Sequence, residues 1–203
     1  SWDTKNYSVV TPKTGKWEIK VDTPPACNNQ SITIQGDNTL HINNVLIGEV
    51  WLCTGQSNME FPVARDPKVK WKTGILHEQK EMQDADYPEI RLFHVEHKLS
   101  PDKEEEDCVG QWLVCNPENL KDFSAVGLMF GRKLYKELNV PVGLIQSTWG
   151  GTHAESWTKM DVMKENPLYE DVRNQFLVEA GKQKSNKYPA TLWNGMIAPI
   201  VGY

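Results

Sequence analysis

The chain has 203 residues, enough for one domain with a sizeable core, or for one domain and a fragment of another. Its 22 Lys and Arg residues and 27 Asp and Glu residues give a net charge of -5, and no basic cluster is present. This balance argues against nucleic acid and anionic membranes as partners, and no apolar run is long enough to span a bilayer.

Residues 1–47 have the pattern of short β-strands. Residues 17–21 and 32–34 alternate apolar and polar side chains, and turn signals lie between and after them at 23–25 and 36–38. A few short strands do not make a stable sheet alone. We therefore expect them to pack on the segments that follow, or to complete a sheet whose other strands lie elsewhere.

From Val45 onward, strand and helix patterns alternate. We predict strands at 45–53, 90–95 and 142–145, with the first apolar on both faces, as in a buried parallel sheet. Ser124 is a candidate cap for a helix that ends at Leu138, before Asn139. Strand, crossover helix and strand together imply a parallel α/β sheet with right-handed connections. The predicted inward stripe of this helix is Val126, Met129, Phe130, Leu134 and Leu138.

Two further segments have recognisable patterns. Residues 96–107 are strongly charged and are predicted to form a solvated loop. A second helix is expected over about 169–184. Its inward residues would be Val172, Phe176, Leu177 and Ala180.

The four cysteines match neither a zinc pattern nor a redox motif. Cys108 and Cys115 flank Trp112, and a disulfide between them would close a short loop. The alternative, which we favour, is that all four are free thiols and that Cys53 is a small core residue.

Residues 55–59, Gly-Gln-Ser-Asn-Met, directly follow an apolar strand. A serine at a turn from strand to helix has an exposed hydroxyl and a free backbone N–H, which is where acyl-transfer enzymes place a nucleophile. The spacing of Ser57 and Glu60 also fits a capping box, in which the hydroxyl only caps a short helix. Position 59 is Met, so the Gly-x-Ser-x-Gly elbow is not matched. The spacing favours neither interpretation over the other.

Gly150 and Gly151 lie in a loop that follows the strand at 142–145. In a parallel sheet, loops at the carboxyl ends of neighbouring strands form the ligand crevice, so this loop and Ser57 are expected at the same edge. Paired glycines let a backbone N–H approach a developing oxyanion closely. A simple tight turn is the alternative.

Three stretches, in order, resemble the sialate O-acetylesterases of the SGNH-hydrolase superfamily: residues 48–60, residues 141–157 and residues 191–199. The resemblance runs from about Lys16 to Tyr203. It implies an α/β fold with a three-layer, SGNH-hydrolase-like parallel sheet over 48–203, truncated at its C-terminal side and preceded by part of a β domain at 1–47. It also implies a secreted, periplasmic or lysosomal location and calls for no metal or cofactor.

By this resemblance, Ser57 is the nucleophile that attacks an acetyl ester of sialic acid. Its own N–H and one from Gly150 or Gly151 would form the oxyanion hole, and Trp157 would help to brace the cleft. His153 is the one candidate here for a substitute base, but a wall residue that touches the substrate is the preferred role. The substrate cleft implied by the resemblance comprises Gln56, Asn58, Trp149, His153 and Glu155.

The family continues into a Gln-Gly-Glu stretch, whose Gln supplies another oxyanion donor, and then into an Asp-His element that supplies the base. Both would lie beyond Tyr203. We therefore expect a downstream segment or a second chain to complete the site, and expect this chain alone to be inactive. Two alternatives stay open: an acetylesterase for plant polysaccharides such as xylan, and a non-catalytic carbohydrate-binding remnant.

Overall fold

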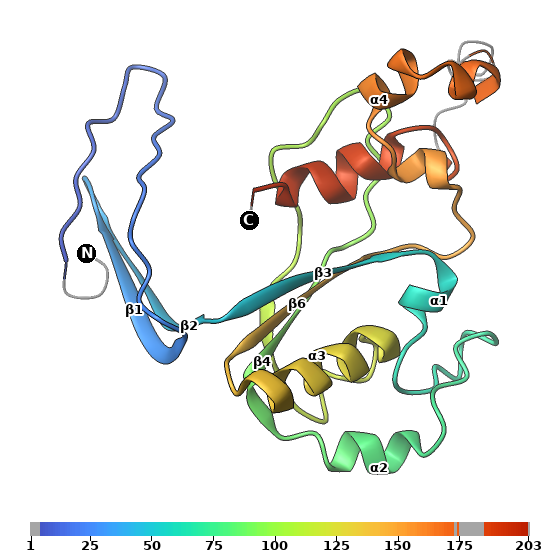
Figure 1. Ribbon diagram of the computed structural model, residues 1–203, viewed down its shortest axis with the longest axis horizontal. Coiled ribbons are helices and arrows are strands. Elements are labelled where there is room, and N and C mark those ends of the chain that lie inside the picture. The colour runs from blue at the N-terminus through green and yellow to red at the C-terminus, as the bar shows by residue number, and fades with distance from the viewer. Residues whose placement is uncertain (1–4, 173, 175–184, 203) are drawn as a thin grey trace.

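The computed structural model describes residues 5–172, 174 and 185–202 and contains two sheets (Figure 1). The strands β1 (Cys27–Gln35) and β2 (Thr39–Ile47) form an antiparallel pair. The second sheet has the order β3-β6-β4-β5. Its strands are β3 (Glu49–Gly55), β4 (Tyr87–His94), β5 (Trp112–Cys115) and β6 (Val142–Thr148).

Short helices and one long helix connect these strands. The α-helices are α1 (Ser57–Glu60), α2 (Glu78–Gln83), α3 (Ala125–Leu138) and α4 (Met160–Glu165). Three segments are 3-10 helices, namely η1 (Ala154–Trp157), η2 (Pro167–Tyr169) and η4 (Ala198–Ile200), and η3 (Trp193–Ile197) is a π-helical turn.

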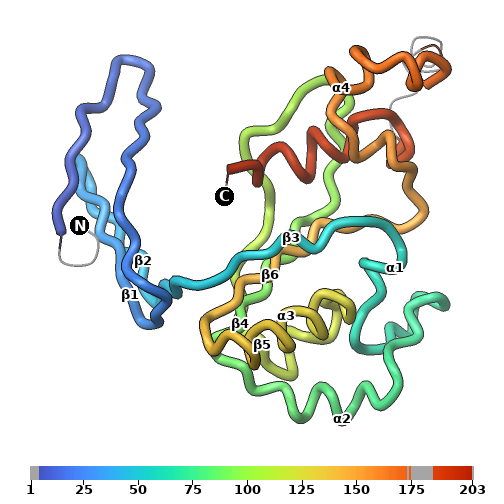
Figure 2. The backbone as a smooth tube through the Cα atoms, viewed as in Figure 1, coloured from blue at the N-terminus to red at the C-terminus, as the bar shows by residue number. Residues whose placement is uncertain are grey.

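The second sheet is parallel at its centre, as the sequence predicts. Strands β3 and β4 both pair in parallel with β6. The edge strand β5 is antiparallel to β4, and it is an addition that the sequence pattern did not indicate (Figure 2). A mostly parallel sheet collects the loops after β3, β4 and β6 at one edge.

Helical segments cover both faces of this sheet, which gives three layers. Figure 1 shows α2 and α3 on one side, and α4 with the C-terminal helical turns on the other. Adjacent residues of β6 point into the two resulting cores: Leu144 packs in the cluster that contains Leu128 of α3, and Ile145 in the cluster with Leu192 and Met196. The predicted three-layer arrangement is confirmed.

The long helix begins and ends where the sequence indicates. The Ser124 side chain accepts a hydrogen bond from the N–H of Gly127, and Asn139 ends the helix in the left-handed conformation. The predicted stripe is partly wrong, because Val126, Phe130 and Leu138 are between two-fifths and half exposed. The buried residues of the helix are Ala125, Gly127, Leu128 and Gly131.

Two strand predictions need correction. Residues 17–21 are not a strand. The apolar run 45–53 is divided at Gly48 between β2 and β3, and a Cβ at Gly48 would lie 2.0 Å from the carbonyl oxygen of Pro141. The chain therefore passes too close to Pro141 for any residue with a side chain. The predicted strands at 32–34, 90–95 and 142–145 lie within or overlap β1, β4 and β6.

The remaining expectations have mixed outcomes. The helix expected over 169–184, with Phe176, Leu177 and Ala180, lies largely outside the described residues. All four cysteines are free, and burial raises the pKa of the Cys53 thiol to about 11.

Within the described parts of the chain, none of the helices has both the length and the apolar character that a membrane crossing requires.

Candidate active site

The two loops singled out in the sequence lie side by side. Strands β3 and β6 are neighbours in parallel register, with Gly55 opposite Thr148 at their carboxyl ends. The N–H of Trp149 donates to the carbonyl oxygen of Gly55 at 3.2 Å, which joins the two loops directly. The Ser57 turn and the Gly150 loop therefore form one edge of the sheet.

Ser57 is the first residue of α1 and has an exposed side chain. Gly55 has a φ of +147°, which lets the chain turn sharply between β3 and α1. The helix is capped at Gln56 without a side-chain hydrogen bond, and the Ser57 hydroxyl lies 3.3 Å from Oε1 of Gln56. The capping-box interpretation is therefore wrong: the hydroxyl is not bound to a helix amide, and Glu60 is directed elsewhere.

Gly150 approaches the Ser57 turn closely. A Cβ at Gly150 would lie 3.5 Å from both Cα and Cβ of Ser57, and 2.8 Å from Oε2 of Glu60. The N–H of Gly150 donates to this Glu60 oxygen at 2.5 Å. Gly151 follows with a φ of +73°. Among the described residues, neither the N–H of Gly151 nor that of Ser57 donates to a partner.

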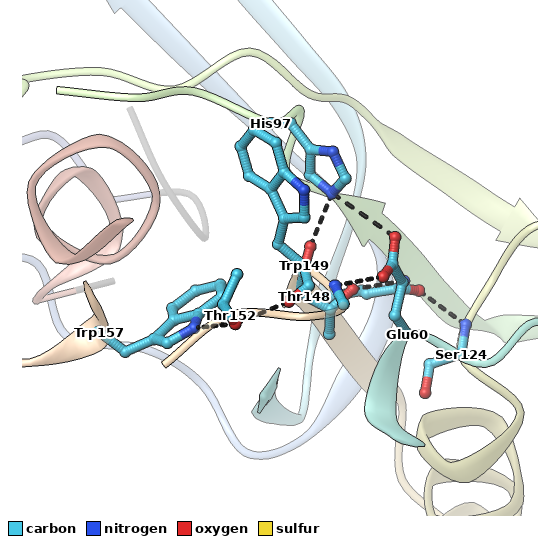
Figure 3. A network of polar contacts seen from close by, with 9 residues as sticks. Glu60, His97, Ser124, Thr148, Trp149, Thr152 and Trp157 are labelled. Atoms are coloured by element: carbon cyan, nitrogen blue, oxygen red, sulfur yellow. Dashed lines mark hydrogen bonds and ion pairs between the residues drawn. The ribbon is translucent and has the colours of Figure 1, made fainter. Parts of the chain in front are cut away.

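Glu60 is also close to His97, in the segment after β4. Nε2 of His97 lies 3.7 Å from Oε1 of Glu60 and 2.8 Å from the carbonyl oxygen of Thr148 (Figure 3). A carbonyl only accepts, so Nε2 carries the hydrogen in this contact. The His97 ring stacks on that of Trp149, with centroids 4.0 Å apart and planes inclined by 5°.

Further hydrogen bonds fix the loop after β6. The Thr152 hydroxyl donates to the carbonyl oxygen of Trp149 at 2.8 Å, and the Trp157 indole donates to the Thr152 hydroxyl at 2.9 Å. The buried Gln146 accepts from the N–H of Ser124 at 2.6 Å and thereby connects β6 to α3. The loop is thus supported by side chains from the elements around it, as Figure 3 shows.

A cavity of about 420 Å³ opens beside Ser57. The two loops supply most of its wall. Its lining consists of Ser57, Glu60, Trp71, Trp149, Gly150 and Gly151.

The other predicted cleft residues do not line this cavity. Gln56 and Asn58 are exposed neighbours of Ser57, and His153 is an exposed residue before η1. Glu155 lies in η1, where its carbonyl oxygen accepts from the N–H of Ala190 at 2.9 Å. Their assignment to the substrate cleft stays a prediction, as do the roles of Ser57 and the two glycines.

Three residues at the site are not predicted by the sequence patterns as contributors. The local spacing of Glu60 indicates only a capping role. His97 had a detectable signal, because it follows a predicted strand of a parallel sheet. Trp71 lies in the irregular segment between α1 and α2, where no periodic pattern marks it.

Comparisons with known proteins all identify acetylesterases that act on carbohydrates or sialic acid. A family model described as carbohydrate esterase, sialic acid-specific acetylesterase matches residues 47–195. Sialate O-acetylesterases from Homo sapiens and Mus musculus are 35% identical over 171 residues and 32% identical over 194 residues, and each match covers 80% of this chain. The chain spans only 30% and 34% of the length of these two relatives.

A solved structure is also similar. The crystal structure of a novel carbohydrate acetylesterase from Xanthomonas citri superimposes with a TM-score of 0.79 at 29% sequence identity. The superposition covers 98% of this chain and 40% of that chain. The superposition therefore extends over both sheets of this chain.

Proposed function

This chain belongs to the carbohydrate esterase family of sialic acid-specific acetylesterases, and on that premise we propose that it carries the nucleophile of a serine esterase that removes acetyl groups from sialic acid. The observation that supports the proposal is the exposed Ser57 hydroxyl at a cavity whose wall includes the backbone of Gly150 and Gly151. A nucleophile and amide donors at one sheet edge are what acyl transfer requires.

The proposed reaction proceeds in two steps. The Ser57 hydroxyl loses its proton to a base and attacks the acetyl carbonyl carbon, and collapse of the tetrahedral intermediate releases the sugar hydroxyl. Water then attacks the acetyl-enzyme, which releases acetate and restores Ser57. The N–H groups of Ser57 and Gly151 are the available donors for the oxyanion.

Two tryptophans suit a carbohydrate substrate. Trp71 and Trp149 line the cavity together with Ser57. Aromatic faces bind the apolar surface of a sugar ring, and a few polar groups orient it. We propose that further contacts to the sugar, outside the cavity lining, come from Gln56, Asn58, His153 and Glu155.

The proposal includes a second polypeptide segment beside β3. The free edge of β3 exposes Val50, Trp51 and Leu52 by 50%, 42% and 45%. An exposed apolar edge strand favours pairing with a further strand. The lining of the cavity, all of which the structure describes, contains no histidine, so the base would come from the segment at this edge. A secreted, periplasmic or lysosomal location belongs to the same proposal and rests on the family resemblance.

An acetyl ester assay tests the proposal. We expect hydrolysis of O-acetylated sialic acid when the chain is expressed within a longer polypeptide that continues past Tyr203, and at least a thousand-fold loss in Ser57→Ala, because the nucleophile is removed. Ser31→Ala, which changes an exposed serine of β1, is the matched control. Acetate release is measured, with acetylated xylan as the competing substrate.

Each result has a defined meaning. Hydrolysis by the chain alone that Ser57→Ala abolishes would contradict the need for a further segment and leave the esterase proposal intact. Preference for acetylated xylan would contradict the sialic acid substrate. No hydrolysis of either ester in any form would contradict the esterase proposal itself.

A further inference from the structure

Glu60 has no part in the reaction proposed above, yet its carboxylate lies at the cavity and is almost buried. The residue is 8% exposed and lies one turn after Ser57 in α1. A carboxylate removed from water is unfavourable unless hydrogen-bond donors or a cation compensate it. Here Oε2 accepts from the N–H of Gly150 at 2.5 Å, and Oε1 lies 3.7 Å from Nε2 of His97.

These contacts connect the ends of three adjacent strands. Glu60 follows β3, Gly150 follows β6, and His97 follows β4. His97 in turn donates to the carbonyl oxygen of Thr148 and stacks on Trp149, both at the start of the Gly150 loop (Figure 3). One side chain is therefore in contact with every segment that builds this edge of the sheet.

The contact to Gly150 has a direct chemical consequence. An N–H that already donates to a carboxylate is not free to stabilise a second anion. A negative oxygen bound at Gly150 would also lie next to the negative charge of Glu60. The N–H of Gly151 has no such competitor among the described residues.

We propose that Glu60 is a positioning residue: its carboxylate holds the Gly150 backbone against the Ser57 turn, so that the N–H of Gly151, and not that of Gly150, faces the oxyanion. The inference rests on the proposed esterase function for its catalytic part only. The contact between Glu60 and Gly150 is a property of the folded chain. It can therefore be measured by hydrogen exchange, without an activity assay.

Two substitutions of Glu60 distinguish the effect of losing its hydrogen-bond acceptor from the effect of losing its negative charge. Glu60→Gln keeps a carbonyl oxygen for the Gly150 N–H, whereas Glu60→Ala removes the acceptor. We expect hydrogen exchange at the Gly150 amide, measured by NMR on ¹⁵N-labelled protein, to accelerate about tenfold or more in Glu60→Ala and much less in Glu60→Gln. In the active enzyme, Glu60→Ala lowers kcat about ten- to a hundred-fold with little change in KM, and Glu60→Gln restores most of it.

Glu78 offers a matched control. Its Oε2 accepts from the backbone N–H of Arg65 at 2.7 Å, which is the same kind of contact outside the cavity lining. Glu78→Ala is expected to alter exchange at Arg65 and to leave both the Gly150 amide and kcat unchanged. An effect common to any carboxylate that accepts from a backbone N–H would instead appear in both alanine variants.

The outcomes distinguish the two proposals. Unchanged exchange at Gly150 in Glu60→Ala overturns the positioning role, whatever the activity. Accelerated exchange with unchanged kcat overturns its relevance to the reaction. If the unsubstituted enzyme shows no esterase activity, the proposed function fails, and the exchange measurement alone decides whether Glu60 holds the loop.

Discussion

Gly150 has no side chain at a position where the Glu60 carboxylate leaves little room for one. Its backbone lies beside Ser57, and a Cβ would be 2.8 Å from Oε2 of Glu60. We predict that Gly150→Ala displaces the Glu60 carboxylate and lowers kcat/KM by about tenfold or more, because a small shift of a catalytic loop is costly. The free energy of unfolding changes by at most about 1–2 kcal/mol, because the obstacle is the end of a flexible side chain.

The measurement compares acetate release and urea unfolding in Gly150→Ala with those in Gly36→Ala. A Cβ at Gly36 meets nothing within 4 Å, so the control should behave like the unsubstituted protein in both assays. Full activity of Gly150→Ala would show that the loop tolerates displacement, and would weaken the argument for close contact with Ser57.

The sequence was informative about backbone positions at the site and less so about side-chain contacts. Ser57 and Gly150 were placed together because parallel strands bring their following loops to one edge. The contact between Glu60 and Gly150 joins residues 90 positions apart, and no local spacing encodes it. The local capping-box pattern even pointed to a different partner for Glu60. Local signals therefore identified the nucleophile candidate but not the residue that supports the loop beside it.

At the scale of elements, α3 is the one whose boundaries follow most directly from sequence. Ser124 is fully buried, and its hydroxyl accepts from the N–H of Gly127 at 3.0 Å. We predict that Ser124→Ala lowers the free energy of unfolding by about 1–2 kcal/mol, because the cap is lost and a buried amide is left without its partner. Urea unfolding monitored by circular dichroism measures this loss.

Lys136→Ala is the control within the same helix. Lys136 is exposed in the last turn of α3, so its removal should change the free energy of unfolding by less than about 0.5 kcal/mol. If Ser124→Ala is as mild as this control, the side-chain cap contributes little and the helix start is fixed by packing alone.

The inward face of α3 was harder to predict than its ends. The apolar periodicity predicts large residues on this face, whereas the helix buries Gly127 and Gly131. A Cβ at Gly131 would lie 2.5 Å from a methyl group of Leu144, so small residues let the helix lie close to β6. Phe130 is left beside Trp51 of β3, with ring centroids 5.0 Å apart. Hydrophobic periodicity records which residues are apolar, not how closely the helix packs against the sheet.

At the scale of the whole molecule, the two sheets differ in how they are covered. In β1 and β2, all of whose residues the structure describes, no side chain is buried, while six of the seven residues of β6 are. The alternation of strand and helix predicted the second sheet well, because its core is formed by periodic apolar segments. No comparable pattern marks β5, which has only four residues and follows a charged loop.

This difference predicts two levels of local stability. No side chain of the β1–β2 pair is fully buried, so opening the pair exposes less buried apolar surface than opening β6 does, and an isolated two-stranded pair is marginal. We therefore expect amides that pair β1 with β2 to exchange with solvent at least about a hundred-fold faster than amides that pair β6 with β3 and β4. Hydrogen exchange with peptide-level mass spectrometry on the intact chain measures both sets in the same sample. Equal protection of the two sheets would show that the N-terminal pair unfolds only with the α/β layers, and that contacts between them contribute more than the exposure of β1 and β2 indicates.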